Sequence, residues 1–400
     1  MPRNLFRLFA FLKRPVSIWT RFLVLFTLLL TFCTVYIESS KSAEPLPISQ
    51  QYNKSTGEND GQDQLFPHDF ERLLSLAKLP FLPDLPSLSV PNYPEDRAVR
   101  EAILAGVTQW HEDQQTRQAF YSASNNLAVY LDMADNQASD KLQTVPSLQP
   151  EGTLLTARIL LGLWASKWEV PQLSFHGKVV VSPDEVLMWR GIQKHRRLAY
   201  SGSRKQFSDG YPWKQRKQVQ QDITLLSQYR VLGQRSIISQ GRVQSVDVNA
   251  PYLSLTPLKK EGKVTAYLVS PGDWISAYEE KSMHFFARVD RRLFELNPRN
   301  DYLALRMGFY LTEHWRRHAH TGKATNVFCM SQLLSASMIP IEKANLTSRF
   351  APRIEAALQK LYAIGLLGEP PLNLSHIDMQ QAYWGKAWLA SSWRLVPSLH

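Results

Sequence analysis

Apolar residues recur at helical or alternating spacing along the sequence after residue 150, and two stretches predict similar orders of elements. In the first stretch, "LLTARILLGLWASKW" predicts a helix and "KVVV" a short strand. "SPDEVLMW" predicts a second helix, because Ser182 and Glu185 have capping-box spacing and Pro183 occupies the first helical position. A longer third helix is expected from about Pro212 to Tyr229. The segments "RSIIS", "YLSLTPL" and "VTAYLVS" then predict strands, and "KKEGK" is the turn between the last two.

The second stretch repeats this plan. "DYLALRMGFYLTEHWRRHA" predicts a long amphipathic helix, "NVFCM" a strand and "SQLLSAS" a short helix. "TSRFAPRIEAALQKLYAIGLL" follows as the third helix, with Phe350, Ile354, Leu358 and Leu361 on its inner face. The last segment, "QAYWGKAWLASSWRLVPSL", is expected to supply closing strands, although its tryptophan spacing also allows a helix.

Helix, strand, helix, helix and hairpin is the order of a winged helix, whose third helix enters the major groove of DNA. The sequence therefore predicts an α+β protein with two tandem domains of this kind. The first domain is expected over residues 150–283 and the second over residues 284–400.

Three further segments precede these domains. Residues 1–37 combine a basic flank with an uncharged apolar run, Phe22–Ile37, which predicts a transmembrane or signal helix. Residues 38–95 are polar and then rich in proline, so we expect a disordered tether. Residues 96–149 are expected to form a helical linker, with helical spacing from Glu95 to about Met133.

The apolar run has three interpretations, which the sequence leaves open. As a membrane anchor, its basic flank would stay in the cytoplasm and direct the rest of the chain outward. As a cleaved secretory signal, it would be removed after Ser42, where small residues stand two apart. In the third interpretation, translation starts downstream and the segment is absent from the working protein.

Composition and charge narrow the class of partner. The 400-residue chain carries a formal net charge of +11, which favours nucleic acid or an anionic membrane surface. Its two cysteines, Cys33 and Cys329, are too few for a disulfide framework, and Cys33 lies inside the apolar run.

Basic residues concentrate in one loop and the helix after it, where Asp209 is the only acid. These residues, which we predict to contact DNA phosphates, are Lys194, Arg196, Arg197, Arg204, Lys205, Lys214, Arg216 and Lys217. Arg349 and Arg353, at the start of the third helix of the second stretch, are predicted to contact bases or phosphates. For each set, the alternative is a solvated surface, and for the loop also a patch lying on anionic lipid.

The sequence gives little support for catalysis. His314 and His318 have helical metal-binding spacing, but no Glu follows the first of them, as a metalloprotease motif requires. We find no P-loop, no GxSxG elbow and no CxxC pair. We therefore expect no enzyme activity, no metal site and no cofactor, and a metal-dependent nuclease is the third-ranked alternative.

Two segments, "ELNPRNDYLALRMGFYLTEHWRRHA" and "SRFAPRIEAALQKLYAIGLLG", resemble tandem winged-helix plasmid replication initiators of the TrfA-like or Rep type. The resemblance covers residues 284–370, is fainter over residues 150–283 and does not reach residues 1–95. It implies binding to repeated duplex DNA sites at a bacterial plasmid origin and recruitment of host replication proteins, with no catalytic centre.

The leading hypothesis is thus a DNA-binding protein that acts by site recognition. Double-stranded DNA is its expected partner, with a second copy of the chain, as a homodimer, and the membrane, through Phe22–Ile37, as further candidates. The alternative is a membrane-anchored extracytoplasmic binding or scaffold protein. DNA binding predicts a cytoplasmic location, whereas an anchor would place the folded part outside.

Overall fold

The computed structural model describes residues 71–73, 75, 85–105, 109–113, 118–123, 126–131, 150–168, 170, 174–194, 210–239, 242–278, 286–319, 326–378, 380 and 383–398. The chain separates into two compact units, Met1–Gly61 and Gln62–His400, and every described residue belongs to the second. The predicted membrane segment Phe22–Ile37 and most of the tether therefore lie outside the described residues. Among the helices that are described, none is both long and apolar enough to span a bilayer.

Part of the stretch predicted to be a disordered tether belongs to the fold. Strand β1 (Ser87–Pro91) pairs antiparallel with β11 (Phe286–Asp290). Leu88 and Val90 are fully buried while Ser89 between them is exposed, which is the alternation of a half-buried strand. The proline-rich composition masked this short alternating pattern.

The helix predicted from Glu95 to about Met133 is wrong beyond Leu104. Helix α5 (Pro94–Leu104) is followed by three antiparallel strands: β2 (His111–Glu112), β3 (Ala119–Ser122) and β4 (Leu127–Leu131). Leu127, Val129 and Leu131 are buried at every second position, because β4 pairs with β7 in the interior of a sheet. From residue 127 to residue 131 the apolar residues therefore follow the alternation of a strand and not the predicted helical spacing.

The first half of the described fold, residues 150–278, contains the first predicted stretch. Its elements are α7 (Pro150–Lys167), β5 (Ser174–Phe175), β6 (Lys178–Val181), α8 (Pro183–Trp189), α9 (Trp213–Gln228), β7 (Tyr229–Ser239), β8 (Arg242–Pro251), β9 (Leu253–Lys260) and β10 (Lys263–Pro271). The hairpin predicted at "KKEGK" is confirmed as β9–β10, in a sheet ordered β5-β6-β10-β9. The hairpin β7–β8 belongs to a different sheet, ordered β2-β3-β4-β7-β8.

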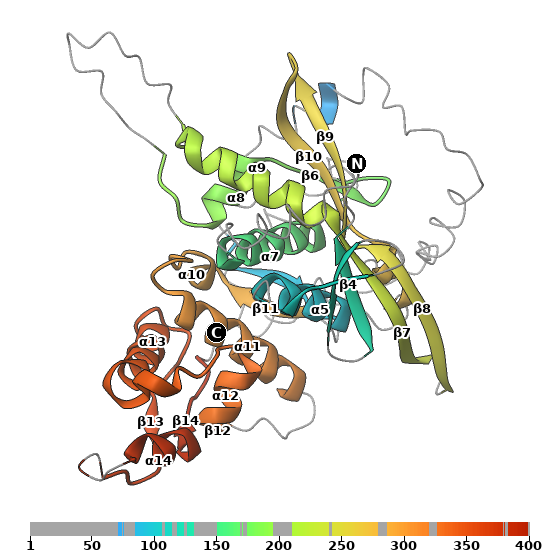
Figure 1. The fold of residues 1–400 in the computed structure, drawn as a ribbon. Coiled ribbons are helices and arrows are strands. Elements are labelled where there is room, and N and C mark those ends of the chain that lie inside the picture. The colour runs from blue at the N-terminus through green and yellow to red at the C-terminus, as the bar shows by residue number, and fades with distance from the viewer. Residues whose placement is uncertain are drawn as a thin grey trace, which may run out of the picture. The chain divides into compact units, whose positions relative to one another are not determined.

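The second half, residues 286–398, contains the second predicted stretch (Figure 1). After β11 come α10 (Arg291–Phe294), α11 (Tyr302–Ala319), β12 (Val327–Cys329), α12 (Met330–Ala336), α13 (Ala351–Ala363), β13 (Leu372–Asn373), α14 (Trp384–Ala390) and β14 (Ser392–Arg394). The last three strands form an antiparallel sheet ordered β12-β14-β13. The closing segment, for which strand and helix were both open, contains the helix α14 and the strand β14. Helices and antiparallel sheets together confirm the α+β class.

Helix α7 is the centre of the packing. Its residues from Gly152 to Trp164 are buried without interruption, as expected of a helix enclosed by other elements on all sides. It contacts β1, α5, α9, β6 and β10. At Gly162 a Cβ atom would lie 2.9 Å from the Cβ of Leu88, so glycine allows β1 to approach the helix closely.

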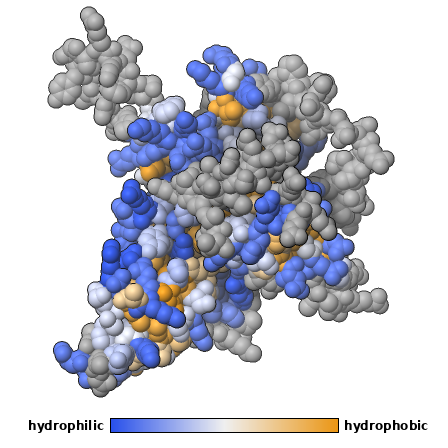
Figure 2. All heavy atoms as spheres, viewed as in Figure 1, coloured by the Kyte–Doolittle hydropathy of each residue, from blue (hydrophilic) through white to orange (hydrophobic). Residues whose placement is uncertain are grey.

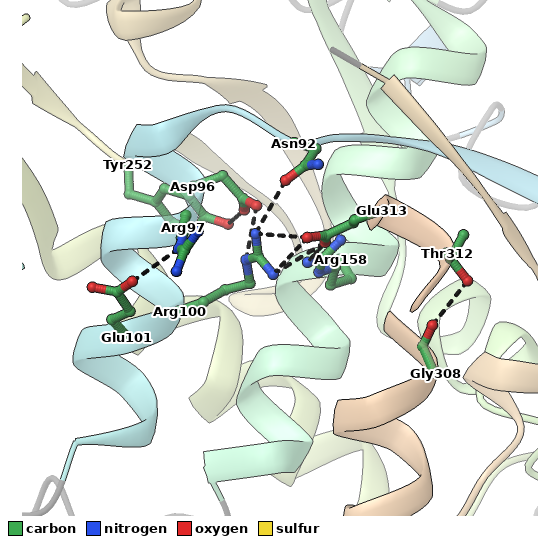
Figure 3. A network of polar contacts seen from close by, with 10 residues as sticks. All are labelled: Asn92, Asp96, Arg97, Arg100, Glu101, Arg158, Tyr252, Gly308, Thr312 and Glu313. Carbon is green, nitrogen blue, oxygen red and sulfur yellow. Dashed lines mark hydrogen bonds and ion pairs between the residues drawn. The ribbon is translucent and has the colours of Figure 1, made fainter. Parts of the chain in front are cut away.

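A buried ionic network joins α5, α7 and α11 (Figure 3). The carboxylate of Glu313, on α11, accepts from Arg100 of α5, with 3.0 Å between Nη1 and Oε1, and from Arg158 of α7. Arg100 also contacts Asp96 through Nε at 3.1 Å, and the Tyr252 hydroxyl donates to Asp96 at 2.7 Å. Burial would raise the pKa of Glu313, but the charges of Arg100 and Arg158 outweigh it and hold that pKa below its ordinary value. The two halves thus share one set of mutually compensated buried charges.

Candidate nucleic-acid interface

One face of α9 presents a stripe of polar side chains to solvent. Its exposed members follow a spacing of three, four and three residues, which places them on one side of a helix: Lys214, Lys217, Gln221 and Thr224. Trp213 precedes them and is 68% exposed, with the Lys217 Nζ 5.2 Å from the centre of its ring. The stripe therefore combines positive charge, amide and hydroxyl groups and an accessible aromatic ring.

The opposite face of α9 is fixed to the core, and this determines which side chains point outward. Val219, Ile223 and Leu226 are fully buried. Between them, the Asp222 carboxylate accepts hydrogen bonds from two residues of α7, Thr153 at 3.0 Å and Thr156 at 3.1 Å. Burial raises the pKa of Asp222, and these hydrogen bonds counteract only part of that rise. The rotation of α9 about its axis is thus set by specific polar contacts as well as by apolar packing.

Polar contacts fix the position of helix α8 beside α9. The Ser182 hydroxyl accepts from the backbone N–H of Glu185 at 3.1 Å, so the predicted N-terminal cap is confirmed. The Glu185 side chain pairs with the buried Lys167 of α7 at 2.7 Å. Arg216 of α9 donates twice to Asp184 of α8, at 2.5 and 2.6 Å. These contacts hold α8 and α9 in a fixed relation.

The β9–β10 hairpin carries lysines at its tip. Glu261 and Gly262 form the turn with φ of 52° and 75°, which suits the tight two-residue turns of hairpins. Three exposed lysines flank the turn: Lys259, Lys260 and Lys263. The amide of Gln220, on α9, donates to the Val264 carbonyl at 3.3 Å. The hairpin and the helix are therefore linked directly.

The structure brings together some of the residues predicted to bind DNA. Lys214 and Lys217 lie on the exposed stripe of α9. Lys194 is exposed, with its Nζ 5.6 Å from the centre of the Tyr211 ring. Arg216 is occupied by its ion pair with Asp184, so its first role is to hold α8. The remaining members of the predicted loop lie outside the described residues: Arg196, Arg197, Arg204 and Lys205.

The predicted arginines of the second half have different surroundings. Arg349 is exposed in a short π-helical turn, Leu346–Phe350, that leads into α13. Arg353 donates to the Tyr302 hydroxyl at 2.7 Å and pairs with Glu342 at 3.3 Å. Arg353 is half-buried, and side chains from outside α13 hold its guanidinium, whereas Arg349 remains exposed.

The sequence interpretation left out several residues of this surface. The hairpin lysines Lys259, Lys260 and Lys263 were recognised only as parts of a turn, and Gln221 and Thr224 were not considered. The signal was available in both cases. Three lysines around a predicted turn mark a basic hairpin tip, and the residues opposite Val219, Ile223 and Leu226 mark the outer face of the helix.

The histidines of α11 pack as part of the helix surface. The rings of His314 and His318 lie 4.5 Å apart between centroids, and the His314 ring meets Phe328 edge-on at 5.0 Å. Across the described ranges, no group of three or more His, Cys, Asp and Glu side chains is arranged to hold a metal ion.

Comparisons with known proteins add little. A scan against protein-family models gives no match for this chain, and a search of curated proteins gives none. A solved structure of domains 2 and 3 of RctB, as a SeMet derivative, has a TM-score of 0.36 and 12% identity, covering 66% of this chain and 85% of its own. A second structure of RctB domains 2–3 has the same TM-score of 0.36 and 11% identity, covering 74% and 97%. TM-scores of this size do not establish a shared fold.

Proposed function

We propose that this chain is a non-catalytic protein that binds duplex DNA and acts by site recognition, as a replication initiator does. One observation carries the proposal: α9, which presents the exposed stripe, is linked to the lysine-tipped hairpin by the hydrogen bond from Gln220 to the Val264 carbonyl. Lysines bind phosphate by charge, glutamine can bond adenine through two hydrogen bonds, and threonine contacts either bases or a thymine methyl group.

In this proposal the first half is a winged-helix variant. The order α7, β6, α8, α9, β9 and β10 matches that of a winged helix, with α9 as recognition helix and β9–β10 as wing. The β7–β8 hairpin, inserted between α9 and the wing, is a departure from that order, and it joins the neighbouring sheet. In the second half, α11, β12, α12, α13, β13 and β14 follow the same plan, with α14 inserted between the last two strands.

The proposal also covers partners and location. The hypothesis includes two copies of the chain bound to repeated DNA sites. It also includes recruitment of host replication proteins and a cytoplasmic location. A reporter fused after His400 that is active only outside the cytoplasm would contradict it.

The decisive experiment is a salt titration of DNA binding. Fluorescence anisotropy with the full chain and a labelled duplex is expected to give binding whose log K falls linearly with log salt between about 50 and 200 mM, by about 0.9 per phosphate contact. The triple variant Lys259→Gln, Lys260→Gln, Lys263→Gln is expected to flatten this slope by about two to three, because it removes up to three phosphate contacts.

The matched control changes three lysines elsewhere on the described surface: Lys343→Gln, Lys360→Gln and Lys386→Gln. It has the same net charge as the hairpin variant but leaves α9 and β9–β10 intact. Binding that is insensitive to salt, or equal slopes for the two triple variants, would refute the proposed interface.

A further inference from the structure

A small hollow between four helices is lined by arginines that the proposed DNA interface does not use. Helices α5, α7 and α11 and the end of α12 enclose it. Its lining includes five arginines: Arg97, Arg100, Arg158, Arg306 and Arg317. No residue of α9 or of the β9–β10 hairpin contributes to it. The hollow is therefore a separate feature that requires its own explanation.

The balance of charge around this hollow is positive. Glu313 is the only carboxylate that lines it, and Arg100 and Arg158 already pair with that group. Arg97 pairs with Glu101 at 3.0 Å and Arg306 with Glu151 at 2.6 Å, but neither carboxylate lines the hollow. Arg317 is exposed and has no ion pair among the described residues. Arg100 also pairs with Asp96 outside the lining, so four of the five guanidinium groups have a carboxylate partner and Arg317 carries the excess positive charge.

Several hydrogen-bond donors of the lining are buried without an acceptor in the described part of the chain. They are the Nε and Nη1 of Arg158, the Nε of Arg306 and the hydroxyl of Ser337. Arg158 is only 1% exposed and Ser337 only 4%. A buried donor without an acceptor costs about 1–3 kcal/mol, and more when the group is charged. An acceptor with several oxygens and negative charge would satisfy these donors together.

The size of the hollow restricts what can enter. Its volume is about 40 Å³. A single water needs roughly 10–15 Å³ of such space, so there is room for about three waters or one small oxyanion, but not for a nucleobase. Tyr310, beside the arginines, adds a phenol hydroxyl that can donate, and this hydroxyl lies 3.4 Å from His314 Nδ1.

We propose that this hollow is a binding site for a single phosphate-type oxyanion, either inorganic phosphate or the terminal phosphate of a small phosphomonoester. Arg317 and Arg97 form its outer rim, while Arg158 and Ser337 supply donors at its base. Arginine suits this role because its planar fork of N–H groups matches two oxygens of one phosphate.

A phosphate of the DNA backbone could also bind in the hollow. Binding of a small phosphate and binding of a backbone phosphate can be distinguished by experiment. A small phosphate would bind without DNA, and rim variants would leave the affinity for duplex DNA unchanged. A backbone phosphate would make the rim variants weaken DNA binding instead.

The test is a phosphate titration of the full chain, followed by calorimetry and by thermal unfolding at constant ionic strength with chloride as the balancing anion. Inorganic phosphate is expected to bind saturably and to raise the unfolding temperature, because it binds the folded state alone. Arg317→Gln and Arg97→Gln are each expected to weaken phosphate binding about tenfold, since each loses a charge-assisted hydrogen bond.

Arg299→Gln is the matched control, because Arg299 is exposed and does not line the hollow. It is expected to bind phosphate as the wild type does. The proposal is overturned if phosphate does not bind saturably, or if the rim variants bind it as tightly as Arg299→Gln. It is also overturned if the rim variants weaken duplex binding, since the site would then serve the DNA backbone. None of these results depends on whether α9 binds DNA.

Discussion

Helices α9 and α13 occupy the same position in two similar orders of elements, yet their outer faces differ. On α9 the exposed stripe includes two lysines and a glutamine, and a lysine-tipped hairpin lies beside it. On α13 the exposed positions are Pro352, Ala356, Gln359, Lys360, Tyr362 and Ala363, with one charged residue among them. Figure 2 shows hydrophilic residues over α8 and α9, whereas apolar residues gather over part of the second half.

The charged residues of α13 also differ in what they contact. Arg353 is held by Tyr302 and Glu342, and Lys360 pairs with Asp301 at 3.5 Å. On α9, Arg216 is held in a similar way by Asp184, but Lys214 and Lys217 remain on the exposed stripe. A shared order of elements therefore does not determine a shared surface. The first half is the better candidate for DNA, although the sequence resemblance is stronger in the second.

The largest expected effect tests whether the two halves form one cooperative unit. Glu313→Ala would leave Arg158 buried without a carboxylate and Arg100 with Asp96 alone, at a cost of about 3–5 kcal/mol in the free energy of unfolding. Urea unfolding, followed by tryptophan fluorescence and by circular dichroism, should show one transition shifted to lower urea. Glu369→Ala removes the exposed partner of Arg394 and should cost less than about 1 kcal/mol. Two separate transitions in the Glu313 variant would mean that the halves fold independently.

A smaller loss in the free energy of unfolding is expected when the pH is lowered. The pKa of Glu313 is depressed in the folded state, so its contribution to stability is present above its unfolded pKa of about 4.3 and is lost as pH falls through the folded value. Asp222 acts in the opposite sense, since its folded pKa is raised. Unfolding measured from neutral pH to about pH 3 should lose less stability in Glu313→Gln than in the wild type. Parallel curves for the two proteins would show that Glu313 does not titrate as inferred.

The difference between the outer faces of α9 and α13 is tested by replacing two basic residues in each region. Lys214→Ala with Lys217→Ala should weaken duplex binding by about 30-fold at moderate salt and reduce the salt slope by about two. Arg349→Ala with Lys360→Ala removes the same charge from α13 and the turn that leads into it, and should change affinity by less than about threefold. Anisotropy titrations of both variants decide the matter. A larger loss from the α13 pair would transfer the interface to the second half.

The smallest effect concerns base recognition. Gln221→Ala should reduce discrimination at one base pair by about fivefold, because a glutamine amide reads the edge of adenine, while leaving the salt slope unchanged. Gln359→Ala, on the exposed side of α13, is the matched control and should leave discrimination unchanged. Competition with a randomised duplex pool measures both. If neither variant changes base preference, α9 binds the backbone alone.

Much of this fold follows from neighbouring residues in the sequence. The cap of α8 needs only Ser182, Pro183 and Glu185, and the β9–β10 turn needs only the residues of "KKEGK". Apolar residues at helical spacing likewise identify α9, α11 and α13. Each of these signals is local, because a cap, a turn or an amphipathic helix is decided within a few residues. Strand β4 was missed, since its pairing with β7 joins segments far apart in the chain.

The sequence by itself determined the α+β class and the helices α7, α8, α9, α11, α12 and α13, but not the strands β5, β8 and β11. Only the tertiary structure decided which charges are engaged internally. Arg216 meets Asp184 across 32 positions, Arg353 meets Tyr302 across 51 and Arg158 meets Glu313 across 155. A basic residue has the same letter whether it is paired or free. Its partner is chosen by packing between distant segments, so the candidate sites could be recognised only after the chain was folded.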